Sequence, residues 1–157
     1  QSCAGLDQQL CGLDIAGQEQ RLAEAVARLS DAGIVCSVFI DADLAQVEAA
    51  KRIGARVCEI HTGPYAHAFY EKGRDAESAA VMAELEKIRA AGQAIRALDM
   101  RFNAGHALNY VNVKPVAAIE GIRELHIGHA IVSRAVFAGL RDAVREMKRL
   151  MTEAAGK

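Results

Sequence analysis

The chain alternates between two kinds of hydrophobic pattern, one with the helical repeat and one with the short apolar runs of buried strands. Four runs of strand length stand at residues 34–40 (IVCSVFI), 55–63 (ARVCEIHTG), 100–105 (MRFNAG) and 122–128 (IRELHIG). Helical spacing lies before, between and after them, at residues 18–32, 44–54, about 78–98, 111–119 and 129–151, with Gly139 as a candidate break. Strands that alternate with helices need right-handed crossovers and therefore a parallel sheet. The sequence predicts an α/β fold.

Length and composition limit the number of domains and the kinds of binding partner. No repeat or linker divides the 157 residues, so we expect one domain over residues 18–157 after an irregular lead-in at residues 1–17. A net charge of −1 lacks the basic surplus of proteins that bind nucleic acid or anionic membranes. No apolar run approaches the roughly 18–20 residues of a membrane span, and the N-terminus lacks the order of a signal peptide. We expect a cytoplasmic protein that binds neither nucleic acid nor membranes.

Polar side chains follow every predicted strand. Because the carboxyl ends of parallel strands meet at one edge of the sheet, these residues are candidates for a common site. They are Asp41 and Asp43 after the first strand, Glu59, His61 and Thr62 at the second, Asn103, Gly105 and His106 at the third, and Gly128 and His129 at the fourth. The sequence therefore predicts a site at this edge.

Several of these residues also have a purely structural interpretation. Asp41 and Asp43 precede a helix, where aspartate commonly caps the first turn. His61 is equally well explained as a partly buried, hydrogen-bonded histidine, and His67 lies in a polar stretch where we expect it to be solvated. A carboxylate inside a core strand, in contrast, costs several kcal/mol unless it is paired or lies in a cleft. Glu59 therefore favours function.

Gly128 and His129 stand directly before a predicted helix. A glycine lets the backbone approach a ligand closely, and the first N–H groups of a helix carry a partial positive charge. This combination suits a phosphate group. Taken alone, a Gly-His pair before a helix is a weak signal.

The four cysteines form no C-x-x-C pair, and two of them, Cys36 and Cys58, lie inside apolar runs. A thiol in such a run behaves as a small hydrophobic side chain. We expect core or incidental thiols, with zinc or a disulfide as the alternative.

Seven sequence motifs resemble the C-terminal part of the pyridoxine 5′-phosphate synthase family. They are GLDIAGQ, VFIDAD, EIHTGPYA, NAGHALNY, NVKPVAAI, ELHIGHAIVSRAVFAGL and AVREMKRLM, which occur in this order, and the resemblance covers about Gly12 to Lys157. The resemblance implies a (β/α)₈ barrel, of which this chain supplies about the last four β/α units. It also implies a homo-oligomer and condensation of 3-amino-2-oxopropyl phosphate with 1-deoxy-D-xylulose 5-phosphate, without a metal or organic cofactor.

The resemblance assigns roles to individual residues. His106 matches the general acid of the family, and Glu59 matches the carboxylate that stabilises the transition state. Gly128 and His129 match the pair that binds the phosphate of the amino-ketone substrate, and Ala107 stands where the family has a glycine at the same site. Proton transfers near neutral pH suit a histidine and a carboxylate.

The chain also departs from the family pattern. Val111 and His126 replace a histidine and an asparagine, and the threonine that contacts deoxyxylulose phosphate would fall near Gln8 or Gln9. The first four strands of the barrel, which carry a glutamate base, have no match. Two hypotheses follow: a pyridoxine 5′-phosphate synthase represented by its C-terminal half, or a non-catalytic half-barrel that binds phosphate or works as an assembly module.

Overall fold

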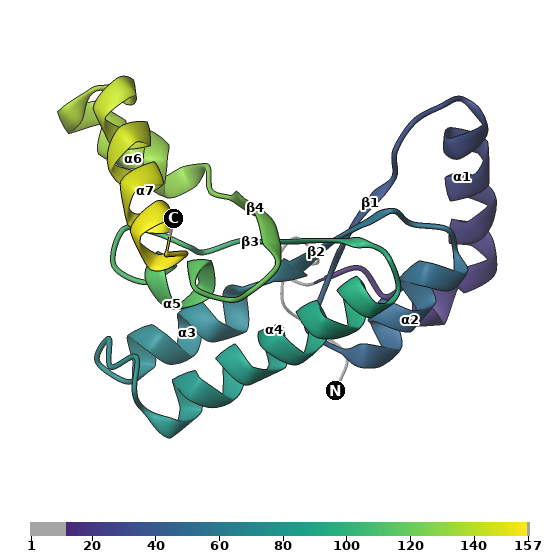
Figure 1. The fold of residues 1–157 in the computed structure, drawn as a ribbon, viewed down its shortest axis with the longest axis horizontal. Coiled ribbons are helices and arrows are strands. Elements are labelled where there is room, and N and C mark those ends of the chain that lie inside the picture. Colours follow the sequence, from purple (N-terminus) through teal and green to yellow (C-terminus); the bar gives the residue numbers. More distant parts are fainter. Residues whose placement is uncertain (1–11, 157) are drawn as a thin grey trace.

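The computed structural model describes residues 12–156, and its strands form one parallel sheet (Figure 1). The strands are β1 (Ser37–Ile40), β2 (Val57–His61), β3 (Arg101–Gly105) and β4 (Ile122–His126), in the order β1-β2-β3-β4. Each run predicted to be a strand contains one of them, so the α/β class and the parallel sheet are confirmed. The strands are shorter than the predicted runs: the first run loses residues 34–36, of which Ile34 and Val35 are exposed, and the second run loses residues 55, 56, 62 and 63.

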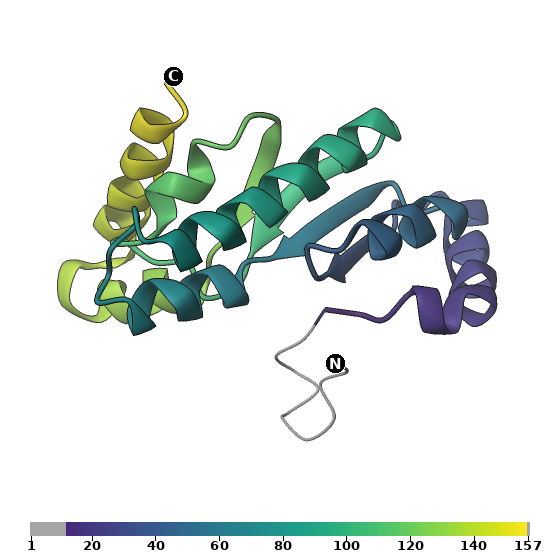
Figure 2. The ribbon, with the colours of Figure 1, turned by 90° about the horizontal axis from the view of Figure 1, so that it is seen from below.

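Helices connect the strands and cover one face of the sheet. They are the 3₁₀-helix η2 (Ala16–Gln18) and the α-helices α1 (Glu19–Asp31), α2 (Leu44–Arg52), α3 (Gly63–Glu71), α4 (Ala79–Ala97), α5 (Val113–Ala117), α6 (His129–Ala138) and α7 (Leu140–Ala154). Helices α2, α3 and α4 lie along the sheet, whereas α1 and the α6–α7 pair lie at opposite ends of the molecule (Figures 1 and 2). Residues 1–11 of the predicted lead-in lie outside the described residues.

The two aspartates after β1 have different roles. Asp43 caps α2, since its carboxylate accepts hydrogen bonds from the backbone N–H groups of Ala45 (2.7 Å) and Gln46 (3.3 Å). The cap expected at Asp41 is wrong, because its carboxylate lies 2.8 Å from the Nδ1 atom of His61 instead. Asp41 therefore pairs with the buried His61 ring at the end of β2, and Asp43 alone caps the helix.

Helix α3 has no counterpart among the predicted helices. It begins with Pro64 in its first turn, where a missing N–H is not needed, and it buries Tyr65 and Phe69. His67 and Glu71 lie on its outer face, with an ion pair of 3.2 Å and His67 75% exposed. The expected solvation of His67 is thus confirmed.

The core lies between the sheet and α2–α4. Cys58, Ile60 and Phe102 point into it from the strands and meet Ile88 and Ile95 of α4. Cys36 and Cys58 are both free and buried, which confirms the interpretation of these two residues as core thiols. Cys3 and Cys11 lie outside the described residues.

The opposite face of the sheet is largely polar and carries two rows of side chains that register across the strands. One row is Phe39, Glu59, Asn103 and Glu124, and the next is His61, Gly105 and His126. This face bears the candidate site. Within residues 12–156 no helix is both long and apolar enough to cross a membrane.

Candidate active site

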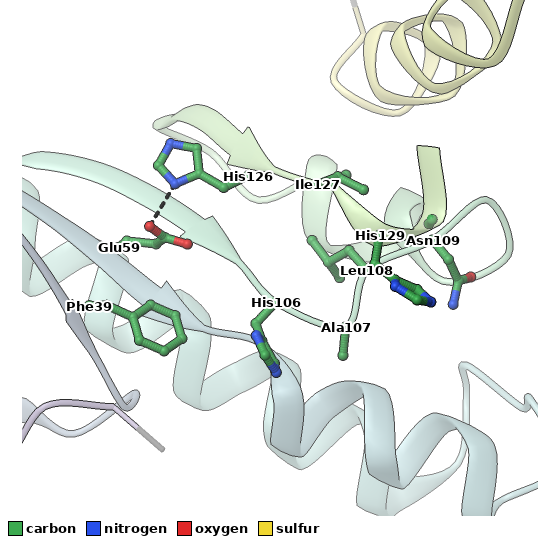
Figure 3. A pocket seen from close by; sticks show the side chains of 11 residues that line it. Phe39, Glu59, His106, Ala107, Leu108, Asn109, His126, Ile127 and His129 are labelled. Carbon is green, nitrogen blue, oxygen red and sulfur yellow. Dashed lines mark hydrogen bonds and ion pairs between the residues drawn. The ribbon is translucent and has the colours of Figure 1, made fainter. Parts of the chain in front are cut away.

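A pocket of about 640 Å³ opens at the carboxyl ends of β2, β3 and β4 (Figure 3). The five residues to which the family resemblance assigns roles all line it, namely Glu59, His106, Ala107, Gly128 and His129. The other candidates at the strand ends do not line it; these are Asp41, Asp43, His61, Thr62, Asn103 and Gly105. The other lining residues are Phe39, Leu108, Asn109, His126, Ile127 and Ala130. The fold therefore brings together side chains from a segment of more than seventy residues, although their roles stay a prediction.

Glu59 reaches the pocket from β2 and is paired there. One of its carboxylate oxygens lies 2.6 Å from the Nδ1 atom of His126, and the side chain is 19% exposed. A carboxylate in this strand was expected to be paired or to lie in a cleft, and both conditions are met. His126, which the sequence marks only as a departure from the family, is the partner that sequence reasoning missed.

His106 follows β3 and lies beside a second imidazole. The centroids of the His106 and His61 rings are 5.0 Å apart, and the Phe39 ring lies 6.1 Å from that of His106. Burial lowers the pKa of His106, and proximity to His61 lowers it further, while Glu59 opposes the shift. His106 is therefore mainly neutral at pH 7, and its protonated form is a stronger acid than an exposed imidazolium.

Two buried polar side chains fix the turn that carries His106. The Thr62 hydroxyl lies within hydrogen-bond distance of the carbonyl oxygens of Gly105 (2.6 Å) and His106. The Asn112 amide donates to the carbonyl of Ala107 at 3.1 Å. Asn112 is fully buried, and only its place shortly after a glycine-containing turn signals this role in the sequence.

Asp41 supports the pocket from behind through His61. The carboxylate of Asp41 contacts the Nδ1 atom of His61 at 2.8 Å and accepts from the Gly12 backbone N–H at 3.3 Å. The hydrogen bond to His61 lowers the pKa of Asp41 against the effect of burial. His61 is 6% exposed, so the prediction of a buried, hydrogen-bonded histidine is confirmed.

The N-terminus of α6 forms the other side of the pocket. Gly128 precedes the helix and His129 begins it, and both residues are exposed. No atom lies within 4 Å of the position that a Cβ on Gly128 would take, so the backbone is open to a ligand here. Among residues 12–156 no group of three His, Cys, Asp or Glu side chains is arranged to hold a metal ion.

Comparison with known proteins identifies the family. A profile described as "Pyridoxal phosphate biosynthesis protein PdxJ" matches residues 9–153. The chain belongs to the PdxJ family. Three curated relatives are all named pyridoxine 5′-phosphate synthase. Their sequences are 75% identical over 145 residues (Aromatoleum aromaticum), 76% over 144 residues (Dechloromonas aromatica) and 51% over 140 residues (Rhodopirellula baltica).

The PdxJ match covers most of this chain but only part of each relative. The aligned segments are 92%, 92% and 89% of the chain and 58%, 57% and 54% of these relatives. PdxJ is a TIM-barrel family, and the four parallel strands found here are half of the eight in such a barrel. The chain thus supplies about four β/α units of the fold, with its pocket at the edge where barrel enzymes hold their active sites.

Proposed function

We propose that the chain contributes the C-terminal half of the active site of a pyridoxine 5′-phosphate synthase. The reaction is the condensation of 3-amino-2-oxopropyl phosphate with 1-deoxy-D-xylulose 5-phosphate. The observation that carries the proposal is the single pocket lined by Glu59, His106 and the Gly128–His129 helix start. The shared name of the curated relatives supports the same reaction.

Condensing an amine with a ketone needs proton transfer and creates positive charge on nitrogen. His106 acts as the general acid in this proposal, and its lowered pKa makes the protonated ring a better proton donor. Glu59 stabilises the charge that develops on the iminium nitrogen, because a fixed carboxylate in a pocket needs no reorganisation during the reaction. The two side chains line the same pocket, as both roles require.

The phosphate of the amino-ketone binds at the start of α6. This helix has ten residues and presents its first backbone N–H groups beside Gly128 and His129. Such N–H groups and the helix dipole favour an anion. Ala107 lines the pocket as well, so its backbone completes the phosphate site in this proposal.

The test is product formation from both substrates, by the chain alone and by the chain coexpressed with the segment of the Aromatoleum aromaticum relative that it does not match. We expect little product from the chain alone, because four strands leave the barrel half complete. Complementation should restore turnover, and His106→Asn should then lower it by roughly 10²–10⁴-fold.

His67→Asn serves as the matched control, since His67 is exposed on α3 outside the pocket residues. It should leave turnover unchanged. Robust turnover by the chain alone would contradict the proposed division of the site. Phosphate binding without turnover in the complemented protein would favour the alternative, a non-catalytic phosphate-binding module.

A further inference from the structure

The hydrogen bond between His126 and Glu59 joins two strands that are not neighbours. His126 ends β4 and Glu59 lies on β2, with β3 between them. The Nδ1 atom of His126 is 2.6 Å from one Glu59 oxygen, and its Nε2 atom is 3.3 Å from an oxygen of Glu124 (the first of these contacts is drawn in Figure 3). The imidazole thus bridges two carboxylates.

A gap in β3 makes this contact possible. Gly105 registers between His61 and His126 in the second row of the polar face. A Cβ atom at Gly105 would lie 2.5 Å from a Glu59 oxygen and 2.9 Å from the backbone oxygen of His126. The Glu59 carboxylate therefore passes over β3 where a side chain is missing.

The partners define the protonation state of the ring. Ionised carboxylates only accept hydrogen bonds, so an imidazole that contacts one through each nitrogen must donate from both. Burial lowers the pKa of His126, but the hydrogen bonds to Glu59 and Glu124 outweigh it and raise the pKa above its ordinary value. The neutral Asn103 amide, 3.4 Å from Glu124, and His106 beyond Glu59 complete the polar groups around this pair.

We propose that His126 is a positioning residue that holds the Glu59 carboxylate in the pocket through a doubly protonated ring tethered from behind by Glu124. The proposal rests on the role of Glu59 in the proposed function, and His126 itself need not touch substrate. A charge-assisted hydrogen bond is shorter and stronger than a neutral one, so the ring restricts the carboxylate to one orientation.

The bridge from Glu59 through His126 to Glu124 depends on pH. The folded-state pKa of His126 is raised, so the bridge is complete below the ordinary histidine pKa of about 6.5 and is lost as pH rises through the raised value. An asparagine at this position keeps one neutral N–H donor toward Glu59 and does not titrate. His126→Asn is therefore the conservative variant, and His126→Leu removes every donor.

The first experiment is histidine-selective ¹⁵N NMR on the chain itself. At pH 6 we expect both ring nitrogens of His126 to be protonated, and we expect Glu59→Gln and Glu124→Gln each to lower its pKa. Glu71→Gln, which alters the separate pair on α3, should leave that pKa unchanged. A singly protonated ring at pH 6, or a pKa indifferent to Glu59→Gln, would overturn the proposal.

The second experiment measures the position of Glu59 directly, through three-bond couplings that report its χ1 rotamer. One rotamer is expected in the wild type and in His126→Asn at pH 6, and averaging over several rotamers in His126→Leu. The His126 side chain is 43% exposed, so neither substitution creates a cavity in the core. An unchanged single rotamer in His126→Leu would refute the positioning role.

Kinetics in the complemented enzyme separate this proposal from the proposed function. His126→Leu should lower kcat roughly tenfold or more, the value of one charge-assisted hydrogen bond, and change KM by less than about twofold. In the wild type we expect kcat to fall at alkaline pH as His126 loses its second proton. His126→Asn should recover most of the rate and should not show this fall, because asparagine does not titrate. Absence of turnover in the wild type would overturn the proposed function alone, because both NMR experiments decide the positioning role without it.

Discussion

Ala107 holds the backbone of the pocket in a conformation that side chains disfavour. Its φ angle is 57°, and that of the preceding His106 is 81°. A left-handed residue other than glycine costs roughly 1–2 kcal/mol unless its surroundings compensate. The hydrogen bonds from Thr62 and Asn112 to this turn supply that compensation.

Ala107→Gly should therefore raise the free energy of unfolding by about 1 kcal/mol, because glycine adopts a positive φ without strain. Urea denaturation measures the change. The matched control is Ala83→Gly on the exposed face of α4, which should lower the free energy of unfolding by about 1 kcal/mol. Loss of stability in both variants would show that the turn is not strained at Ala107.

At this scale the sequence predicts which residues gather but not what they contact. Glu59, His106 and His129 stand after strands, and a parallel sheet must bring such residues to one edge. The Glu59–His126 pair depends on the missing side chain at Gly105 of the intervening strand β3 and on a strand register that the hydrophobic pattern does not encode. The same holds for Asp41, which could serve equally well as a helix cap or as a histidine partner.

The strands were the most predictable elements, because each is an apolar run bounded by turn residues. The break between α6 and α7 was also predictable, since Gly139 has a φ of 79° that ends one helix before the next begins. Helix α3 was missed, since no helix is predicted between residue 63 and about residue 78, although Tyr65, Ala66 and Phe69 form a helical apolar face. Proline at the first turn starts a helix rather than ending it.

At Gly105 the arrangement of β2, β3 and β4 depends on the absence of a side chain. Gly105→Ala should lower the free energy of unfolding by about 1–3 kcal/mol, since the new methyl group would meet Glu59 and the backbone of His126. Thermal or urea unfolding measures the loss. Gly128→Ala is the control and should change stability by less than about 0.5 kcal/mol, because its Cβ would face open space. Equal effects of the two changes would contradict the crowding at Gly105.

At the scale of the whole molecule, the notable feature is an exposed apolar surface on the α6–α7 pair. The side chains are Val132, Val136, Phe137, Leu140 and Val144, with Phe137 92% and Val136 76% exposed. Removing such surface from water stabilises an assembly by about 25 cal/mol per Å². We propose that copies of the chain associate through this surface, in keeping with the homo-oligomer that the family resemblance implies.

Sedimentation velocity measures the mass of the assembly. Phe137→Glu should shift the chain toward the monomer, because a buried charge at the contact is costly. Lys72→Glu on the exposed surface after α3 makes a larger charge change elsewhere, from positive to negative, and should nevertheless leave the mass unchanged. A monomer in the wild type, or an assembly insensitive to Phe137→Glu, would contradict association through this surface.

The most direct measurement of the central claim is an NMR titration of the labelled chain with 3-amino-2-oxopropyl phosphate and, in parallel, with inorganic phosphate. Both ligands should shift the backbone amides of His129, Ala130 and Ile131 at the start of α6, because both carry the phosphate group that we propose to bind at this helix N-terminus. Only the amino-ketone should also shift the His106 ring and the Glu59 side chain. Saturable binding that leaves all of these resonances unmoved would contradict the assignment of this pocket as the substrate site.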